Sequence, residues 1–495
     1  MAAVSGRQNL PVPDSPPASR PVLRHAWSES DRFVPRSFVR PAQRFMRTEA
    51  SGGIAMLIAA VVALVWANSP FSGSYEDLWR TRLEVNLGEL IHLDHLDLRA
   101  WVNDGLMAIF FFVVGLEIKR ELVLGDLRDR KAAALPAIAA LGGMVVPALV
   151  YTAFNFGGDG ARGWGVPMAT DIAFAVGIVS LLGRRVPTGA KIFLLTLAVV
   201  DDIGAIIVIA IFYAEGMAFG WLAAAFAGLG VILLMRRGDV RSLVPYLTVG
   251  AFVWLALLES GVHATLAGVV LGVLTPVWSF YDPKRFGGHA RRMVGDIERR
   301  FADDVLTDEE HERNQAGLED LARLTAETAS PLERLEHRLA PWVAFGVVPI
   351  FALANAGVSL SGDAVDGALT DPVILGVALG LLVGKTVGVF GATWLAARLG
   401  IGRLPAGTTW RHVLGLAVTA GVGFTVALFV ASLAYRTPEL TDAAKIGILA
   451  GSLLAGILGY LFLRSCPVPD HAKVAASEPG LAGDRPHTPT GAAAT

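Results

Sequence analysis

The sequence predicts an all-α polytopic membrane protein with about twelve transmembrane helices. Hydrophobic residues make up 53% of the 495 residues and charged residues only 17%, a composition far from that of ordinary soluble domains. Apolar stretches of the roughly 20 residues that a bilayer crossing requires recur along the chain. Lys and Arg gather in alternate connections between these stretches, as expected of cytoplasmic loops. The three observations agree on a bundle of membrane-spanning helices.

The predicted crossings form an ordered series along the chain. They lie at 52–68, 101–118, 132–154, 164–183, 190–213, 217–235, 244–258, 261–277, 341–357, 372–396, 411–434 and 443–463. Crossings three to five start on the cytoplasmic side and crossings ten to twelve start outside, so the two triplets run in opposite senses. This pattern predicts an inverted-topology repeat, with crossings four and eleven in its corresponding middle positions.

Basic residues set the expected orientation of the crossings. Arg44 and Arg47 precede the first crossing, and basic residues at 119–131 follow the second. The connections between basic loops are acidic or nearly uncharged, for example around Glu215 and Glu259. Because cytoplasmic loops collect Lys and Arg, we expect both termini to lie in the cytoplasm.

Three segments outside the crossings predict soluble structure or disorder. Residues 1–48 mix Pro, Ser and Arg without an apolar core, which predicts a disordered cytoplasmic arm. Residues 466–495 are rich in Ala, Gly, Pro and Thr and predict a disordered tail. The membrane domain at 49–465 contains a charged cytoplasmic loop at 281–338, where leucines at helix-like spacing predict a helical excursion.

The first external loop predicts a small β-hairpin. Leu83, Val85 and Leu87 alternate with polar residues before Gly88, as in one arm of a hairpin. A hairpin with one apolar face needs a packing partner. Homodimer contact through residues 83–98 satisfies that need, and so does a lid packed on its own domain.

Four ionisable residues stand in the middle of predicted crossings, where a charge is expensive. They are Asp171, Asp201, Asp202 and Lys385, each flanked by apolar residues on both sides. Asp104 lies closer to the external surface. Mutual pairing is the purely structural explanation, but three acids against one base leave carboxylate unneutralised. We therefore expect an ion pathway.

Asp201 and Asp202 are consecutive, so their side chains point about 100° apart on a helix and must have different roles. One can face an ion while the other pairs with Lys385, the only deep cation in the sequence. A carboxyl group in an apolar environment holds its proton more tightly than in water, and its oxygens also suit small hard cations. Competition between a proton and a cation for the same oxygens predicts antiport by alternating access.

The fourth and eleventh crossings contain residues that interrupt helices. Pro167 and Thr170 immediately precede Asp171, and Gly423 is one of three glycines in the eleventh crossing. Discontinuous helices leave terminal dipoles inside the membrane, where Asp171 and Lys385 can compensate them.

Six sequence strings carry a resemblance to a known family. In chain order they are ATDIAFAVG, VVDDIGAIIVIAIFY, GVHATLAGV, RLEHRLAPWVAF, FALANAGVSL and GVGFTVALFVASL. Over about residues 50–464 the chain resembles the NhaA-type sodium/proton antiporters. The resemblance implies a bacterial inner-membrane protein, surrounded by lipid, that serves sodium and pH homeostasis. It also implies electrogenic exchange of cytoplasmic Na+ or Li+ for external protons, without a cofactor.

The resemblance implies roles for individual residues. Asp202 matches the principal ion ligand of the family, Asp201 matches its partner acid, and Lys385 matches the lysine that pairs with that acid. Asp171 and Thr170 match residues of the interrupted fourth helix that assist ion binding. The transported Na+ would then bind at Asp202 and Asp201.

The family is also controlled by pH, and the resemblance extends to residues linked with that control. They are Glu117, Glu121, His263, Glu336 and His337, while Asp104 matches an acid near the external side. Salt bridging with Lys119 or Arg120 at a helix end is the alternative role for Glu117 and Glu121. A hydrogen-bonded cap is the alternative role for His263, which starts a helix.

Two departures from the family pattern bear on these roles. Ala340 stands where a histidine often precedes the Pro-Trp pair, which bears on the pH profile. Thr386 stands where a proline often follows the buried lysine, which bears on the local helix.

Other functional classes fit the sequence less well. An intramembrane aspartyl protease could use Asp171 and Asp202 as its dyad, but Val200 stands where such enzymes usually carry a glycine. A passive cation channel gives no reason for Lys385. A net charge of −2 excludes the basic field that nucleic-acid binding requires.

Overall fold

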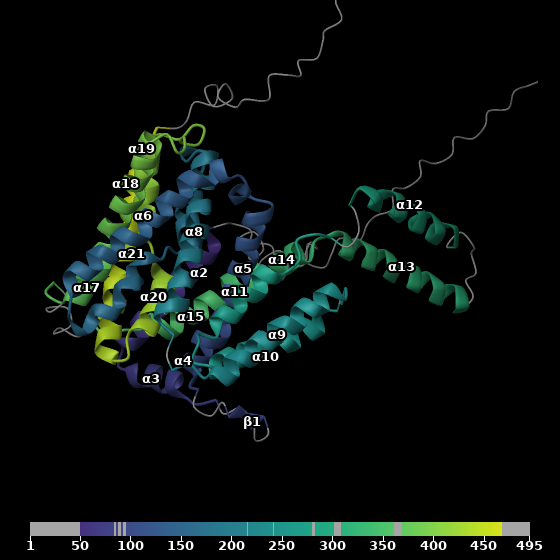
Figure 1. Ribbon diagram of the computed structural model, residues 1–495, viewed down its shortest axis with the longest axis horizontal. Coiled ribbons are helices and arrows are strands. Elements are labelled where there is room, and N and C mark those ends of the chain that lie inside the picture. The colour runs from purple at the N-terminus through teal and green to yellow at the C-terminus, as the bar shows by residue number, and fades with distance from the viewer. Residues whose placement is uncertain are drawn as a thin grey trace, which may run out of the picture. The chain divides into compact units, whose positions relative to one another are not determined.

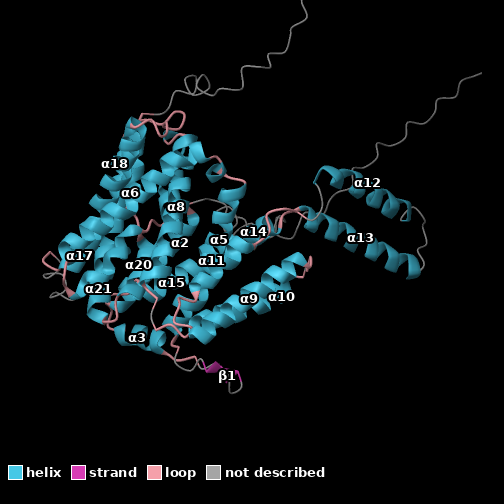
Figure 2. Cartoon of the chain, in the orientation of Figure 1, coloured by secondary structure: helices cyan, strands magenta, loops and turns pink. Residues whose placement is uncertain are grey.

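The computed structural model describes residues 50–83, 86–87, 91–92, 96–214, 216–240, 242–279, 283–300, 308–360 and 369–467. Nearly all regular structure in these residues is helical (Figure 2). The all-α class predicted from the sequence is therefore confirmed. The predicted disordered arm and the predicted tail beyond residue 467 lie outside the described residues.

Each predicted crossing coincides with one helix or with consecutive helices (Figure 1). In chain order these elements are α2 (Ser51–Ala67), η3 and α5 (Trp101–Leu106, Met107–Val123), α6 (Arg130–Asn155), η5 and α7 (Asp159–Met168, Ile172–Leu181), α8 (Thr188–Phe212), α9 (Phe219–Arg237), α10 (Leu243–Glu259), α11 (Thr265–Leu274), α14, η7 and α15 (Pro331–Trp342, Val343–Val347, Val348–Asn355), α17, η8 and α18 (Pro372–Leu379, Gly380–Gly384, Lys385–Arg398), α19 and α20 (Trp410–Thr419, Phe424–Ala434) and α21 (Pro438–Arg464). Here η5 is a 3₁₀ helix, whereas η3, η7 and η8 are π-helical turns.

Helix length and composition identify a multi-pass membrane protein. Among the described residues, six helices are long and apolar enough to cross a bilayer, or up to 9 when each bent helix pair counts as one crossing. The bent pairs are α2 with α3 (Ser72–Arg80), η5 with α7, and α19 with α20, at 114°, 42° and 45°. Helices α10 and α11 are apolar but shorter. The total of twelve crossings stays a prediction.

Short elements occupy several of the connections. They are α3, the strands β1 (Asn86–Leu87) and β2 (Ile91–His92), and the helical turns α4 (Leu98–Ala100), η4 (Asp126–Arg128) and η6 (Gly183–Arg185). The strands pair antiparallel, with Asn86 opposite His92, in the segment for which the sequence predicts a hairpin. The residues between the strands lie outside those that the structure describes.

Glycines bring helices of the bundle into backbone contact. A Cβ atom on Gly388 of α18 would overlap the carbonyl oxygen of Gly142 in α6. A Cβ atom on Gly268 of α11 would overlap the carbonyl oxygen of Ala108 in α5 in the same way. In a bilayer the hydrophobic effect does not drive helices together, so close packing through small residues contributes to their association. The contact between α6 and α18 holds Lys385, one turn before Gly388, inside the bundle.

The charged segment predicted as a loop is helical in its described parts. Helices α12 (Pro283–Arg300) and α13 (Asp308–Thr328) contact each other. Leu318, Leu321 and Leu324, whose spacing predicts a helix, lie in α13.

Helix α14 begins at Pro331, inside the charged loop predicted at 281–338, and continues into η7 and α15 of the predicted ninth crossing. The side chain of Ser330 accepts a hydrogen bond from the backbone N–H of Glu333 at 3.1 Å, and Pro331 occupies the first turn. A serine cap followed by proline is a favourable helix start.

Candidate ion-binding site

Two interrupted helices contact each other at their interruptions. Residues 169–171 separate η5 from α7, and residues 420–423 separate α19 from α20. The backbone N–H of Asp171 donates to the carbonyl oxygen of Val422 at 2.7 Å. The hydroxyl of Thr170 donates to the carbonyl oxygen of Ala420 at 2.9 Å. Both helix interruptions predicted from the sequence are therefore present, and they contact each other.

Asp171 lies at the start of both second half-helices. Its Oδ1 accepts a hydrogen bond from the N–H of Phe174 at 3.0 Å, in the first turn of α7. Its Oδ2 accepts hydrogen bonds from the N–H and the hydroxyl of Thr425, in the first turn of α20, at 3.1 and 2.6 Å. A carboxylate suits this position because helix N-termini expose unpaired N–H groups and partial positive charge. Asp171 thus compensates two buried helix dipoles.

Lys385 provides the matching positive charge, and its side chain is fully buried. Its Nζ donates to the Oδ1 and Oδ2 of Asp201 at 2.9 and 2.7 Å. It also donates to the carbonyl oxygen of Met168, the last residue of η5. The ammonium group therefore neutralises one carboxylate and donates a hydrogen bond to a carbonyl group that has no helical partner at a helix C-terminus. The structure brings Asp201 and Lys385 together as the sequence predicts.

Thr386 does not disturb the helix that carries this lysine. Its hydroxyl donates to the carbonyl oxygen of Leu382 at 2.5 Å. Helix α18 continues beyond it to Arg398. Threonine in place of the proline of the family pattern therefore lies in an α-helix that directly follows the π-helical turn η8, with its hydroxyl satisfied by the backbone of that turn.

Asp202 differs from its neighbour in its surroundings. The residue is only 5% exposed, and the described part of the chain offers its carboxylate no hydrogen bond or ion pair. Asp201, Asp171 and Glu117 all act on Asp202 electrostatically. Its oxygens are therefore free for a proton or a cation, and the surrounding negative charge favours both. Two consecutive acids on α8 thus have separate environments, as their angular offset requires.

Thr170 links the helix crossing to the ion pair. Its hydroxyl donates its one hydrogen to the carbonyl oxygen of Ala420, and its backbone lies near the carboxylate of Asp201. A shift of the crossing would therefore be felt at Asp201 and, through it, at Lys385.

A second charged cluster surrounds Arg120 at the end of α5. Arg120 bonds to Glu336 of α14, and it lies 3.9 Å from Glu117 and 3.7 Å from Glu121. Its side chain is 37% exposed. The three glutamates predicted as pH-sensing candidates thus share one arginine, which is also the salt bridging expected on structural grounds alone. His337, next to Glu336, is exposed and makes no hydrogen bond within the described residues.

The remaining candidates lie apart from both clusters. The Nε2 of His263 donates to the carbonyl oxygen of Tyr213, the residue that caps α8, at 2.8 Å. Asp104 lies in the π-helical turn η3, and its carbonyl oxygen accepts a hydrogen bond from the indole of Trp254 at 2.8 Å. Neither residue contacts the Asp201–Lys385 pair.

Sequence reasoning missed two partners of the site. Thr425 supplies two of the hydrogen bonds to Asp171, and Met168 supplies a carbonyl oxygen to Lys385. The position of Thr425 two residues after Gly423, in the first turn after the helix break, could have identified it, because hydroxyl residues cluster at helix starts. A backbone carbonyl leaves no such signal in the sequence.

The comparisons with known proteins agree with this geometry. The family model described as Na+/H+ antiporter 1 matches residues 43–463. The chain belongs to this antiporter family. It is 48% identical over 424 residues to the Na(+)/H(+) antiporter NhaA of Oleidesulfovibrio alaskensis, covering 86% of this chain and 93% of that protein. It is 46% identical over 446 residues to the Na(+)/H(+) antiporter NhaA 2 of Sorangium cellulosum, covering 88% and 93%.

Membership decides between functional classes that the sequence left open. Proteins of this family are antiporters and not enzymes, so the aspartyl-protease reading of Asp171 and Asp202 is excluded. The antiporter is a multi-pass membrane protein, in agreement with its apolar helices.

Proposed function

We propose that the chain exchanges cytoplasmic Na+ or Li+ for external protons, with Asp202 as the shared ligand. The observation that carries this proposal is the contrast between two consecutive acids. Asp201 is held by Lys385, whereas Asp202 is buried without a bonded partner among the described residues. A bare carboxylate is costly at membrane depth, so it binds either a proton or a small hard cation. The two cargoes therefore exclude each other.

Electrogenic exchange follows from the ion pair beside this ligand. A Na+ ion at Asp202 gains oxygen ligands when Asp201 turns away from Lys385. The ammonium then lacks its counter-ion in an apolar site, where an unpaired charge is too costly to keep, and it releases its proton. One proton from Asp202 and one from Lys385 leave for each Na+ that enters, so each cycle moves net charge.

Alternating access is assigned to the two crossed helix pairs. The bends of 42° and 45° in the two pairs are nearly equal, which supports an inverted repeat of crossings three to five and ten to twelve within a twelve-helix protein. The interruption at 169–171 carries Thr170 and Asp171, and it is joined to the interruption at 420–423 by one backbone hydrogen bond and one hydrogen bond from the Thr170 hydroxyl. Movement of this crossing would open the site to one side of the membrane at a time.

Regulation by pH is assigned to the cluster around Arg120. Arg120 belongs to α5 and Glu336 to α14, so protonation of Glu336 weakens a contact between two helices, whereas protonation of Glu117 weakens a pair within α5. Glu117 also acts electrostatically on Asp202. A change in the charge of Glu117 would therefore change the affinity of Asp202 for its ion. His337 and His263 extend the set of candidate pH-sensing residues.

The membrane arrangement is proposed from loop charges. We place the protein in the bacterial inner membrane, as its membership of the NhaA-type antiporters implies. We place both termini in the cytoplasm, because basic residues gather in the connections that this orientation puts inside. The strand pair of β1 and β2 is the proposed contact between two copies in a homodimer.

Membrane vesicles with a preformed proton gradient test the proposal. Added Na+ should dissipate the gradient when the chain is present, and an imposed membrane potential should change the rate. A cation current without proton counter-movement would support the channel alternative and contradict the proposal. Vesicles without the chain provide the baseline.

A further inference from the structure

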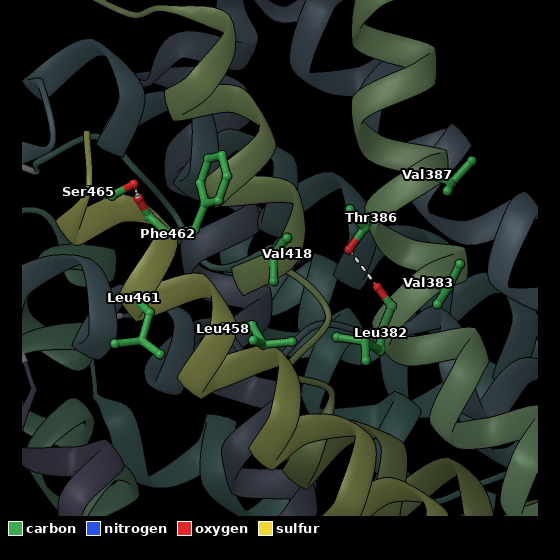
Figure 3. A pocket seen from close by; sticks show the side chains of 9 residues that line it. All are labelled: Leu382, Val383, Thr386, Val387, Val418, Leu458, Leu461, Phe462 and Ser465. Carbon is green, nitrogen blue, oxygen red and sulfur yellow. Dashed lines mark hydrogen bonds between the residues drawn. The ribbon is translucent and has the colours of Figure 1, made fainter. Parts of the chain in front are cut away.

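A pocket outside the ion site opens between α18, α19 and α21 (Figure 3). Its volume is about 610 Å³, and aliphatic side chains such as Leu382, Val418 and Leu458 form its walls. The hydroxyls of Thr386 and Ser465 also line it, but each already donates to a backbone carbonyl, at 2.5 and 2.6 Å. The pocket therefore offers hydrocarbon and no free polar group from its wall.

The pocket is continuous with the outer apolar surface of the bundle. Val383 and Val387 on one wall are 47% and 55% exposed, and Leu458 and Leu461 on the other are 46% and 53% exposed. In a multi-pass membrane protein such a surface contacts lipid. An occupant of the pocket can therefore enter directly from the bilayer, and an acyl chain has the matching chemistry.

Three exposed arginines lie at one end of the pocket. Arg464 precedes Ser465 of the pocket wall, and its carbonyl oxygen accepts a hydrogen bond from Arg185 at 2.9 Å. The carbonyl oxygen of Arg185 in turn accepts a hydrogen bond from the Nε2 of His412, the neighbour of Arg411, at 3.2 Å. None of the three arginines forms an ion pair within the described part of the chain. The rim thus carries unneutralised positive charge.

We propose that this pocket binds an anionic phospholipid, with one acyl chain in the pocket and the phosphate at Arg411 and Arg464. Guanidinium groups match phosphate oxygens in charge and in forked hydrogen-bond geometry. A zwitterionic lipid offers the same acyl chain but adds a cation where the rim is already positive. The combination of an open apolar pocket and a basic rim therefore selects the anionic lipid.

The pocket lies next to the helices that carry the ion-binding site. Thr386 of its wall directly follows Lys385, and Val418 lies two residues before Ala420, whose carbonyl oxygen holds Thr170. A bound acyl chain contacts both elements and fills the space between them. The inference goes beyond the proposed exchange, and a binding assay tests it independently of transport.

Lipid titration of the purified full chain in detergent, followed by native mass spectrometry, tests the headgroup contact. Phosphatidylglycerol should bind more tightly than phosphatidylcholine with the same acyl chains. Each arginine near an anionic headgroup is worth about fivefold in affinity, so Arg411→Gln with Arg464→Gln should weaken phosphatidylglycerol binding roughly 25-fold. The matched control is Arg398→Gln, because Arg398 is an arginine that lies 5.2 Å from the Trp394 ring centre and outside the rim.

Filling the pocket tests the acyl contact. Leu458→Trp should abolish tight binding of phosphatidylglycerol, whereas Leu453→Trp should not, because Leu453 is 56% exposed on the same helix but outside the pocket. If Leu458→Trp fails to fold, Leu461→Trp provides the same obstruction nearer the outer surface. The proposal is overturned by equal affinity for the two lipids or by binding that survives the double arginine change. It is also overturned if soluble glycerophosphate, which lacks acyl chains, binds as tightly as phosphatidylglycerol. Occupation by a second copy of the chain, seen as a dimer lost in Leu458→Trp, also overturns it.

Discussion

The antiporter contains two clusters of acidic and basic side chains that differ in their exposure to water. Around Lys385 the charges are dry, with side chains 0% and 1% exposed for the lysine and Asp201. Around Arg120 they are partly wet, with side chains 37% and 15% exposed for the arginine and Glu336. Water screens the second cluster and not the first. A charge without a partner is therefore costly in the buried cluster around Lys385 and inexpensive in the cluster around Arg120.

This difference suits the buried cluster around Lys385 to ion exchange and the partly exposed cluster around Arg120 to regulation. In the dry cluster a change of partner forces a proton to leave, which is the event that exchange requires. In the wet cluster protonation changes a helix contact by a modest amount, which suits adjustment.

The largest effect is expected from Asp202→Asn, which keeps the shape of the side chain and removes its charge. Sodium-driven proton movement in vesicles should fall to the background rate, because the amide can bind neither a proton nor Na+ in exchange. The control is Asp104→Asn, which removes an acid outside the site and should retain exchange. Normal exchange in Asp202→Asn would show that the ligand is elsewhere.

Lys385→Ala should lower the free energy of unfolding by about 3–5 kcal/mol, since it leaves the Asp201 carboxylate buried and unpaired. Electrogenic transport should be lost as well. Thermal unfolding of the purified protein measures the first effect. Adding Asp201→Asn removes the orphaned charge and should recover part of the stability. Additive losses in the double variant would contradict a direct pair.

Thr425→Val should lower stability by about 1.5–3 kcal/mol, because it removes a hydroxyl bonded to a charged carboxylate at the helix crossing. Thr393→Val is the matched control. Thr393 is also buried, but its hydroxyl donates to the neutral carbonyl of Val389 at 2.6 Å, so its replacement should cost about 1 kcal/mol. Equal losses in the two variants would argue against a special role for the contact between Thr425 and Asp171.

The smallest stability effect is expected from Arg120→Gln, below about 1 kcal/mol, because partly exposed ion pairs contribute little. Its main consequence should be a shifted dependence of exchange on pH, measured as proton flux across a pH series. High salt should weaken the Arg120 cluster in the parent protein and leave the Lys385 pair intact. An unchanged pH profile would assign the cluster to structure alone.

The dry cluster could be predicted from sequence because charges inside apolar stretches are anomalies that composition alone exposes. Asp171, Asp202 and Lys385 all stand out in this way. The partners that complete the site could not be predicted, since Thr425 and Asp171 are 254 residues apart and Met168 contributes only its backbone. The start of α14 depends on a local cap at Ser330, a signal that a search for apolar stretches does not use.

The shared-ligand claim is tested most directly by counting protons released when Na+ binds. Calorimetric titration of the purified protein, in two buffers that differ in ionisation enthalpy, gives this number. We predict about two protons per Na+ for the parent chain, about one for Lys385→Ala, and neither Na+ binding nor proton release for Asp202→Asn. Na+ binding to the parent chain without proton release would contradict competition at Asp202.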